Sequence, residues 1–528
     1  MNILFALYGD FSSNSANPLA LYARELHASG HCCAIAVPAG LETACLHQDP
    51  KFRPILFSEV LAAPQSVFPD GRPADVIHAC TPREVIRRFV TAYMAKRPTP
   101  LVIYLEDNET WIATQALGID EATLGQHTAL EISARLPEVL AHPFFSHSFI
   151  GLADAVAVIQ DKLRVKVPPW VRCETVMIGV DVELFSPRPA DLSLRETYRV
   201  ANHEKIIVYH GGMNQFTRPA IETLCQAVGL MNQQGYPCRL LRTGPMALDF
   251  LAKLPRETAA AIIDIGMLSR QELPALLALA DVFVQPGGMD PFEDLRLPGK
   301  VPEFFAMGRP VLMPAANIAY LVRDGVDAVL LSTGSSEEIA AKCSELFGDS
   351  QRADAIGRAG RQLAETYFDV RIQARRLEDV YNMARDRFDA AMATETWRDA
   401  DESTPVTLLL ARKLLWLAAS SKTLAFEPSD ILQEHARFIE LMQQRVTGLE
   451  ASIAERDFTA TAAQILSLKQ QLTERDRQIA QLKEAIDGFS NSGSWKLTAP
   501  LRKAKSFVEI ARQRMKLVWL FRRMGRPK

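Results

Sequence analysis

A lysine and a glutamate three residues apart offer the clearest chemistry in this sequence. Lys300 and Glu303 follow a stretch rich in glycine and proline, residues 286–299. Backbone amides at a helix start, with a lysine beside them, suit a diphosphate. A glutamate in the same first turns can accept two hydrogen bonds from a ribose diol. The pattern therefore predicts a nucleotide site, and the alternative is a glutamate that only favours the helix dipole beside a solvated lysine.

The elements around this pair predict a strand, a loop, a helix and a strand in succession. Residues 282–284 form a short apolar run that predicts a buried strand, and residues 311–313 predict the next one. Between them, residues 285–299 are expected to form a loop rather than a helix, and residues 300–307 a short helix that ends at Gly308. In open parallel sheets, ligands bind beyond the carboxyl ends of the strands, so this loop is expected to line such a crevice.

Residues 297–314, LPGKVPEFFAMGRPVLMP, resemble the signature of glycosyltransferase family 4, whose members have the GT-B fold. The resemblance implies that Lys300 contacts the donor phosphates and that Glu303 binds the ribose. Family members often carry a second glutamate about two helical turns earlier, and Leu295 stands at that position here. The acidic residue that contacts the donor sugar is therefore unassigned. Two acidic residues lie nearby but out of register: Glu293 and Asp294.

A second phosphate contact is predicted after the strand over residues 205–210, which is followed by Gly211 and Gly212. Family members place an arginine and a lysine after this glycine turn; Arg218 stands where the lysine is expected, and the arginine position falls on either Met213 or Asn214. A backbone nest with one cation is still adequate for a diphosphate. Gly244, after the next strand, permits close approach of a ligand. The predicted donor-binding residues are Gly211, Gly212, Gly244, Lys300 and Glu303, with Arg218 and Lys300 as the catalytic cations.

The first half of the chain begins as doubly wound domains do. Residues 3–7 predict a strand buried on both faces, and residues 19–28 a helix. This start resembles the acceptor domain of the family, in which the loop after the first strand faces the cleft. Residues 12–15 are candidates for acceptor or phosphate contacts, unless Ser15 or Asn17 simply caps the following helix. The residues predicted for the acceptor side of the cleft are Gly9, Asp10 and His78.

Three acidic residues cluster at the end of another strand. The strand predicted from residue 100 runs into Glu106, Asp107 and Glu109, at the edge where such sheets place their chemistry. Like charges this close can raise the pKa of one carboxyl group, which suits acid–base catalysis. Glu106 and Asp107 are therefore predicted to be catalytic, and the alternative is a solvated acidic loop. His78, on an earlier strand, is expected in the core or along the cleft rather than as a base.

The region between the two halves also resembles the family. Residues 136–149 predict a helical segment, and residues 150–159 match the last strand of the family's first domain. Residues 174–187 resemble the family's crossover into the second domain. A long helix near residues 370–388 is similar to the family's closing helix, which packs back across the first domain.

Length and composition favour two domains with an appendage. At 528 residues the chain is too long for one core, and its net charge of -3 gives no pull toward nucleic acid. The eight cysteines are scattered without a C-x-x-C pair, which favours a reducing compartment and argues against structural zinc. No apolar run is long enough to cross a bilayer, and the N-terminus does not resemble a signal peptide, so a cytoplasmic location is expected. The predicted segments are two Rossmann-like domains at 1–186 and 187–390, a linker with a short helix at 391–430, a coiled coil at 431–488 and a basic tail at 489–528.

The last segments predict self-association and membrane contact. Apolar residues recur at intervals of three and four over residues 439–453 and 465–486, which predicts a coiled coil and a homo-oligomer, although an intramolecular hairpin fits as well. Residues 493–503 resemble a C-terminal tag of bacterial surface-polysaccharide glycosyltransferases. Residues 502–528 interleave basic and aromatic side chains, as in a helix lying on an anionic membrane surface, and the alternative is a basic disordered end.

The resemblance implies an α/β protein of the GT-B fold with a helical coiled-coil extension. It implies a retaining glycosyltransferase that moves a sugar from a nucleotide-sugar donor to a glycan or lipid-linked acceptor in cell-surface polysaccharide or lipopolysaccharide synthesis, at the inner face of the cytoplasmic membrane. Cations and helix dipoles stabilise the diphosphate in this fold, so no metal or other cofactor is expected. Two alternatives stay open: a noncatalytic GT-B scaffold, which Leu295 and the lone Arg218 favour, and a GT-B sugar-nucleotide epimerase, which the tail disfavours.

Overall fold

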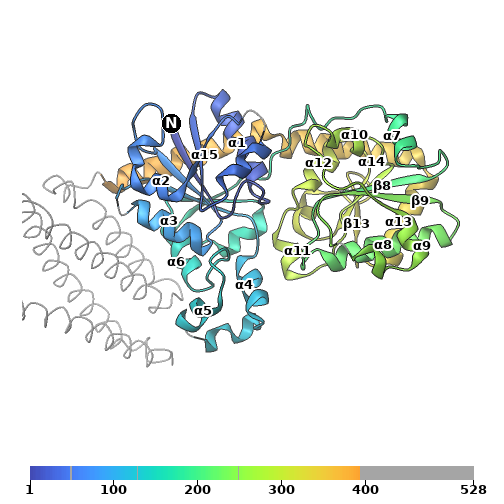
Figure 1. Ribbon diagram of the computed structural model, residues 1–528, viewed down its shortest axis with the longest axis horizontal. Coiled ribbons are helices and arrows are strands. Elements are labelled where there is room, and N and C mark those ends of the chain that lie inside the picture. Colours follow the sequence, from blue (N-terminus) through green and yellow to red (C-terminus); the bar gives the residue numbers. More distant parts are fainter. Residues whose placement is uncertain (48–49, 95, 128, 248, 393–528) are drawn as a thin grey trace, which may run out of the picture. The chain divides into compact units, whose positions relative to one another are not determined.

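The computed structural model describes residues 1–47, 50–94, 96–127, 129–247 and 249–392 of the chain, and these residues form two parallel sheets with helices on their faces (Figure 1). The predicted coiled coil and basic tail lie outside the described residues. Within the described part of the chain, no helix has the length and apolar character of a membrane span.

The first sheet has seven parallel strands in the order β3-β2-β1-β4-β5-β6-β7. Its central strands β1 and β4 are buried along their whole length, as expected when helices cover both faces. The strand order reverses between β1 and β4, and ligands in such sheets bind at this switch point, beyond the carboxyl ends of the strands. The strands are β1 (Asn2–Leu7), β2 (Cys32–Val37), β3 (Arg53–Leu56), β4 (Val76–Cys80), β5 (Leu101–Leu105), β6 (Ala155–Val158) and β7 (Arg172–Thr175).

The second sheet has six parallel strands in the order β10-β9-β8-β11-β12-β13. Its switch point lies between β8 and β11, so the loops that follow these two strands meet at one place on the carboxyl edge. The strands are β8 (Lys205–His210), β9 (Cys238–Thr243), β10 (Ile262–Asp264), β11 (Val282–Val284), β12 (Val311–Pro314) and β13 (Val329–Leu331).

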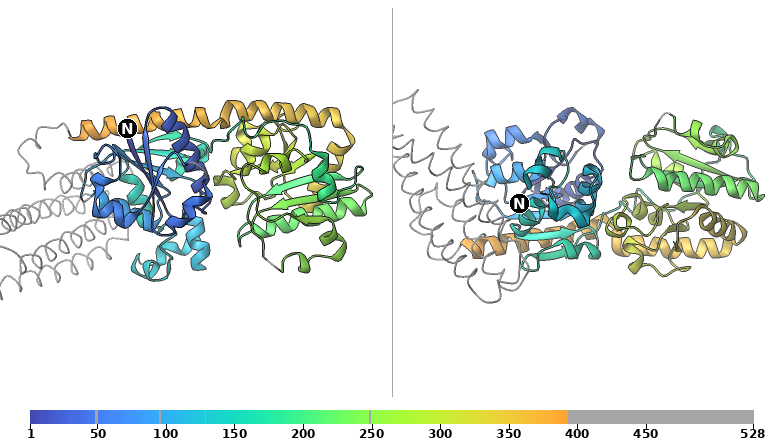
Figure 2. Two further views of the ribbon diagram at one scale, coloured as in Figure 1. Left: turned by 45° about the horizontal axis from the view of Figure 1, so that its top comes forward. Right: turned by 90° about the horizontal axis from the view of Figure 1, so that it is seen from below.

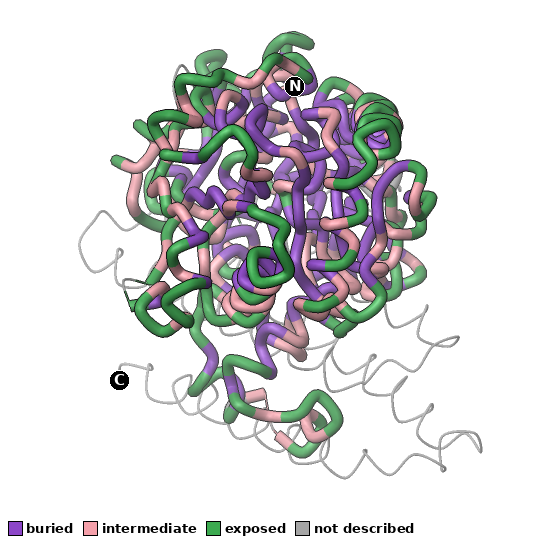
Figure 3. Tube along the Cα trace, turned by 90° about the vertical axis from the view of Figure 1, so that its right-hand side faces the viewer, coloured by how far each residue is buried: buried purple, intermediate pink, exposed green. Residues whose placement is uncertain are grey.

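Helices cover both sheets, and the buried residues gather along the strands and on the inner faces of the helices (Figure 3). The helices of the first half are α1 (Ala16–Ala28), α2 (Phe57–Ala62), α3 (Glu84–Met94), α4 (Glu109–Leu117), α5 (Ala129–Arg135) and α6 (Phe145–Gly151). Those of the second half are α7 (Leu192–Thr197), α8 (Arg218–Gln233), α9 (Arg256–Ala260), α10 (Leu273–Leu277), α11 (Pro291–Leu295), α12 (Lys300–Ala306), α13 (Ser336–Gly348), α14 (Ser350–Leu363) and α15 (Val370–Met392).

The last described helix, α15, packs against the first sheet although it follows the second one in the chain. It lies against α1 and along β4, β5 and β6 (Figure 2). Its Tyr381 hydroxyl lies 2.9 Å from His78 Nδ1 in the core of the first domain. The prediction of a closing helix that returns to the first domain is therefore confirmed.

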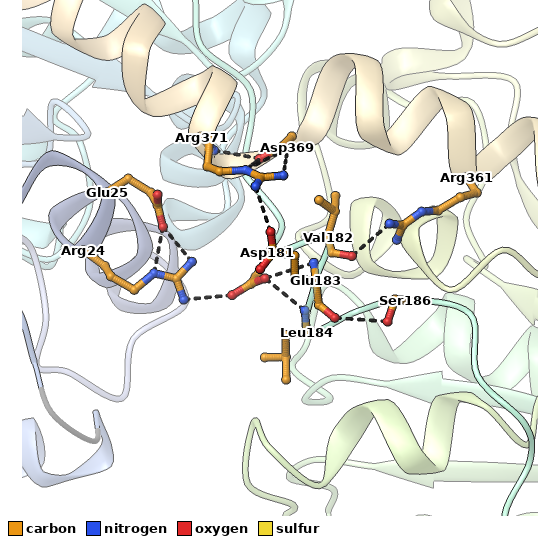
Figure 4. Close-up of polar contacts among 10 residues, drawn as sticks. All are labelled: Arg24, Glu25, Asp181, Val182, Glu183, Leu184, Ser186, Arg361, Asp369 and Arg371. Carbon is orange, nitrogen blue, oxygen red and sulfur yellow. Dashed lines mark hydrogen bonds and ion pairs between the residues drawn. The ribbon is translucent and has the colours of Figure 1, made fainter. Parts of the chain in front are cut away.

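Two crossover segments connect the halves and pair with each other. Val180 N donates to Phe368 O at 2.7 Å, and Val370 N donates to Val180 O at 3.0 Å. Arginines from both halves hold the first of these segments (Figure 4): Arg24 Nη1 lies 2.8 Å from Asp181 Oδ2, and Arg361 Nη2 donates to Val182 O at 2.9 Å. The crossover is thereby tied to α1 on one side and to α14 on the other.

Three predictions about local structure are wrong. Residues 136–149 are not one helix, because Pro137 and Pro143 interrupt the segment between α5 and α6. The strand matched at 150–159 is not the last of its sheet, since β7 pairs with it on the far side. Residues 285–299 are not entirely loop: α11 forms there because the Asp290 carboxylate accepts the amides of Phe292 and Glu293 and caps the helix.

Candidate functional site

The switch point of the second sheet brings Lys300 against the loop that follows β8. The φ of Gly211 is +131°, which favours glycine, and a Cβ atom there would lie 2.8 Å from Lys300 Cε, so a side chain at this position would displace the end of the lysine. Lys300 Nζ donates to the Tyr209 hydroxyl at 3.1 Å and lies 4.5 Å from the centre of the Tyr209 ring. The first residue of α12 is thereby fixed beside the glycine turn, as the nucleotide prediction requires.

Gly244 lies where two backbone segments approach each other closely. Its φ is +108°, and a Cβ atom there would lie 2.7 Å from the carbonyl carbon of Gly211. A side chain at this position would therefore push the loop after β9 away from the loop after β8. The sequence predicted close approach by a ligand, whereas the structure shows close approach by the Gly211–Gly212 backbone; the role of Gly244 in donor binding stays a prediction.

Glu303 is buried near the carboxyl end of β8, between Arg270 and His210. Its Oε1 lies 2.8 Å from Arg270 Nη2, and its Oε2 lies 2.8 Å from His210 Nε2. Burial acts to raise the pKa of Glu303, but the charges of Arg270 and His210 prevail and lower it to about 2. Each carboxylate oxygen has a further lone pair, so the ionised group can still accept hydrogen bonds from a ribose diol.

The structure adds His210 and Arg270 to the residues that the sequence analysis proposed. His210 ends β8, and Arg270 lies in the loop after β10, far from Glu303 in the sequence. Only the strand order β10-β9-β8-β11 brings them together. For His210 the available signal was a polar residue at the carboxyl end of a predicted strand, whereas Arg270 lies beyond its strand, and spacing along the chain could not pair either residue with Glu303.

Replacing Glu303 with glutamine is expected to lower stability at neutral pH. Because its pKa falls from 4.5 to about 2 on folding, the ionised carboxylate contributes up to about 3 kcal/mol. That contribution is present above pH 4.5 and is lost as the pH falls toward 2. The melting temperature of Glu303→Gln should therefore be lower than that of the parent at pH 7, and the difference should shrink between pH 5 and pH 3. An equal difference at all three pH values would contradict this ion pairing.

Arg218, the other predicted cation, is the first residue of α8. Its Nε donates to Glu222 Oε1 at 3.0 Å, one helical turn further on, and its guanidinium lies 5.8 Å from the centre of the Phe250 ring. The side chain is about one third exposed, 36%. No contact joins it to Lys300 within the described residues, so its role as a catalytic cation stays a prediction.

Acidic residues near the same loop have structural partners. Glu293 is buried, and its Oε1 lies 2.6 Å from Arg296 Nη2. Burial raises the pKa of Glu293, and Arg296 opposes this rise. Asp290 caps α11, Asp294 pairs with Lys162 of the first domain, and Leu295 packs partly buried against the core. The sugar-contacting acidic residue of the family thus has no assigned counterpart in α11.

The first sheet positions Glu106 at the end of β5, next to the switch point. Ser15 Oγ donates to its Oε2, and Cys80 Sγ donates to its Oε1 at 3.3 Å. Burial raises the pKa of Glu106 to about 7, and the neighbouring Asp107 adds to the rise. Ser15 does precede α1, but its hydroxyl does not cap the helix; it holds Glu106 instead.

The rest of the acidic cluster surrounds a buried arginine. Arg83 Nε donates to Glu109 Oε1 at 3.0 Å, and its guanidinium lies 3.8 Å from the centre of the Tyr8 ring. Burial raises the pKa of Asp107, and the charges of Arg83 and Arg296 oppose this rise. Glu109 is only 7% exposed, so it is not a solvated residue, whereas Glu106 and Asp107 are half-buried and their catalytic role stays a prediction.

Of the residues predicted for the acceptor side of the cleft, two lie at the switch point and one lies in the core. Gly9 and Asp10 follow β1 at the switch point, and the Asp10 carboxylate accepts from Ser12 N at 2.9 Å, which closes the turn. His78 is not a cleft residue, because it is 0% exposed and packs against Phe5. Its burial lowers its pKa to about 3, so the ring is neutral. His78 therefore belongs to the core.

Contacts also join α11 to the first domain. Asn108 Nδ2 donates to Pro291 O at 3.3 Å, and Gln160 Nε2 donates to Asp294 O at 2.8 Å. The Trp111 ring, on α4, stacks on the Phe292 ring at a centroid distance of 5.0 Å. The loops that follow β5, β6 and β11 are therefore in direct contact, close to both predicted sites.

Comparison with known proteins agrees with this geometry. Residues 204–349 match the family model described as Glycosyl transferases group 1, and this range includes Gly211, Gly244, Lys300 and Glu303. No curated protein sequence matches the chain.

Solved structures match the described fold. HepE of Anabaena in complex with UDP and glucose has a TM-score of 0.55 at 15% identity, over 72% of this chain and 99% of that one. A glycosyltransferase of Rickettsia africae has a TM-score of 0.54 at 13% identity, over 72% and 98% of the two chains. Sucrose-phosphate synthase of Thermosynechococcus elongatus has a TM-score of 0.55 at 14% identity, over 74% and 100%.

At these identities the likeness to solved structures establishes the fold, and the family model establishes the kind of enzyme. The two parallel sheets, with their switch points and closing helix, are those of the GT-B fold. Through its glycosyl transferases group 1 domain at residues 204–349, the chain is a glycosyltransferase of the GT-B fold.

Proposed function

We propose that this glycosyltransferase uses a nucleotide-sugar donor, with UDP as the first nucleotide to test, and transfers the sugar with retention to a glycan or lipid-linked acceptor. The observation that carries the donor part is Lys300 at the β8/β11 switch point, in contact with Gly211 and one helical turn before the buried carboxylate of Glu303. UDP is chosen because structures of HepE contain UDP and UDP-glucose. Retention follows from the resemblance to glycosyltransferase family 4.

The donor residues have distinct tasks in this proposal. Negative charge grows on the diphosphate as the bond to the sugar breaks, and Lys300 stabilises that charge without moving, because Tyr209 already holds it. Glu303 accepts hydrogen bonds from the ribose hydroxyls. It stays ionised because Arg270 and His210 keep its pKa low. A positioned cation and backbone amides can stabilise this leaving group without a metal, and we propose that they do.

The acceptor is proposed to bind between the carboxyl edges of the two sheets. Glu106 and Asp107 lie on the first-domain side, where a carboxyl group that titrates near pH 7 can accept the proton of an acceptor hydroxyl. A role in surface-polysaccharide synthesis and binding of the basic tail to an anionic membrane belong to the same proposal. The residues that carry them, 489–528, lie outside the described part of the chain.

The proposal is tested with a panel of UDP-, GDP-, ADP- and dTDP-sugars. We expect the protein to hydrolyse or transfer one donor class, at the same rate with and without EDTA, and to form a product whose anomeric configuration, read by NMR, equals that of the donor. The variant Glu303→Ala should bind the matching nucleoside diphosphate about tenfold more weakly in calorimetry, because a charge-assisted hydrogen bond to the ribose is lost. Failure to bind any of the four nucleoside diphosphates would overturn the proposal.

A further inference from the structure

A fully buried arginine lies directly beneath the glycine turn of the proposed donor site. Arg242, on β9, is 0% exposed, and its Nη1 lies 2.8 Å from Asp264 Oδ1. Its Nη2 donates to the carbonyls of Gly211 at 3.2 Å, Gly244 at 3.0 Å and Pro245 at 3.3 Å. One guanidinium thus binds both loops, the one after β8 and the one after β9, from the side of the core.

These bonds set the direction of the backbone amides. A trans peptide is planar, so its N–H points away from its C=O. Because the Gly211 carbonyl points toward Arg242, the Gly212 amide points away from it, and the Pro245 carbonyl fixes the Met246 amide in the same way. The buried guanidinium therefore turns two N–H groups outward.

Among the described residues, these two amides have no hydrogen-bond acceptor, whereas three other amides of the same loops do. Gly211 N donates to Thr243 O at 3.0 Å, Met213 N to Pro245 O at 2.9 Å, and Gly244 N to Gly266 O at 2.9 Å. Gly212 is exposed and Met246 is half-buried. The loops thus present two donors without an acceptor, one of them directly after Gly211, which lies against Lys300, as in the backbone nests that bind anions.

We infer that Arg242 is a positioning residue for the donor diphosphate: it holds the peptides at Gly211–Gly212 and Pro245–Met246 so that their amides face the phosphates. This inference rests on the proposed function. It does not require Arg242 to touch the ligand. It explains why a charged side chain occupies a strand position whose neighbours, Leu241 and Leu240, are apolar and buried.

The test compares diphosphate with nucleoside. UDP, GDP, ADP and dTDP are first screened by calorimetry on the parent protein, and the one that binds is compared with its own nucleoside on each variant. We expect Arg242→Met to bind the diphosphate about tenfold or more weakly and the nucleoside within about twofold. Arg242→Lys, which keeps the charge but not the forked donor, should fall between.

Arg239→Met is the matched control. Arg239 lies at the opposite end of the same strand, where its Nε donates to Glu204 Oε1 at 2.7 Å and its Nη1 to Ala260 O at 2.6 Å. The variant Arg239→Met therefore loses an ion pair and a carbonyl contact like those lost in Arg242→Met, but in a side chain that does not contact the donor loops. It should bind the diphosphate as the parent does, and a loss as large as that of Arg242→Met would overturn the inference.

Hydrogen exchange on the parent gives a reading that does not depend on how well a variant folds. Peptides that cover residues 209–217 and 243–249 should gain protection with the diphosphate and none with the nucleoside. A parent that binds the diphosphate without this protection, or an Arg242→Met variant that binds it as tightly as the parent, would overturn the inference and leave the proposed function standing. A parent that binds none of the four diphosphates would overturn both.

Discussion

Replacing Lys300 with alanine is expected to lower the rate of sugar transfer about 100- to 1000-fold, the loss that follows when one preorganised electrostatic group is removed from a transition state. The lysine stands where strand order alone places a ligand, between the loops after β8 and β11. Its ammonium is held by the Tyr209 hydroxyl and ring, so it needs no rearrangement to meet the leaving diphosphate. The fall should therefore appear mainly in kcat.

Three comparisons separate this role from a structural one. Lys300→Arg keeps the charge and should retain more activity than Lys300→Ala. Tyr209→Phe removes only the hydroxyl that holds Nζ and should lower the transfer rate less than Lys300→Ala or Lys300→Arg does. Lys205→Ala removes a lysine at the amino end of β8, where Nζ lies 3.1 Å from Asp281 Oδ1, and should leave transfer unchanged. A Lys300→Ala enzyme within about threefold of the parent rate would refute the assignment of Lys300.

The sequence predicted the second domain well because its signals are local. Short apolar runs, glycines at strand ends and a helix start are each encoded by neighbouring residues, and the β11–α12–β12 unit around Lys300 formed as expected. The GT-B fold and the return of α15 to the first domain came from the family resemblance, and both are confirmed.

What the sequence could not predict depends on contacts between distant segments. Arg270, His210 and Arg242 act on the donor loops from other strands, and only the strand order brings them there. His78 is a core residue because α15 covers it, a packing that residues near position 78 do not encode. Ser15 occupies a cap position, yet its hydroxyl donates a hydrogen bond to Glu106, 91 residues away in the sequence.

Glu106→Gln is expected to lower kcat/KM about 100-fold and to remove a pH dependence centred near 7. The pKa of this carboxyl is raised to about 7 by burial, so its charge changes within the working range of most enzymes. If the ionised form accepts the proton of the acceptor hydroxyl, the parent's kcat/KM rises with pH and levels off above about 7. Glutamine cannot accept that proton, so the variant's residual activity should lack this rise.

The same pKa gives the opposite expectation for stability. A group whose pKa is raised on folding stabilises the folded state when protonated, and that contribution is lost as the pH rises through the folded value, here about 7. At pH 8 the parent therefore carries a half-buried charge that opposes folding, whereas glutamine is neutral. Glu106→Gln should melt at an equal or higher temperature than the parent at pH 8, and should show no such gain at pH 5.

Glu109→Gln is the matched control, because Glu109 follows the same strand but is paired with the buried Arg83. Burial raises the pKa of Glu109 and Arg83 opposes this rise. At pH 8 the loss of the carboxylate leaves the buried Arg83 without that partner, so this variant should lose stability at pH 8 and keep the pH dependence of the rate. An unchanged pH profile in Glu106→Gln would show that another group produces it. A variant that is slower and also less stable at pH 8 would point to Glu106 as a structural residue, whereas a slower and more stable one fits a half-buried carboxylate kept for its chemistry at some loss of stability.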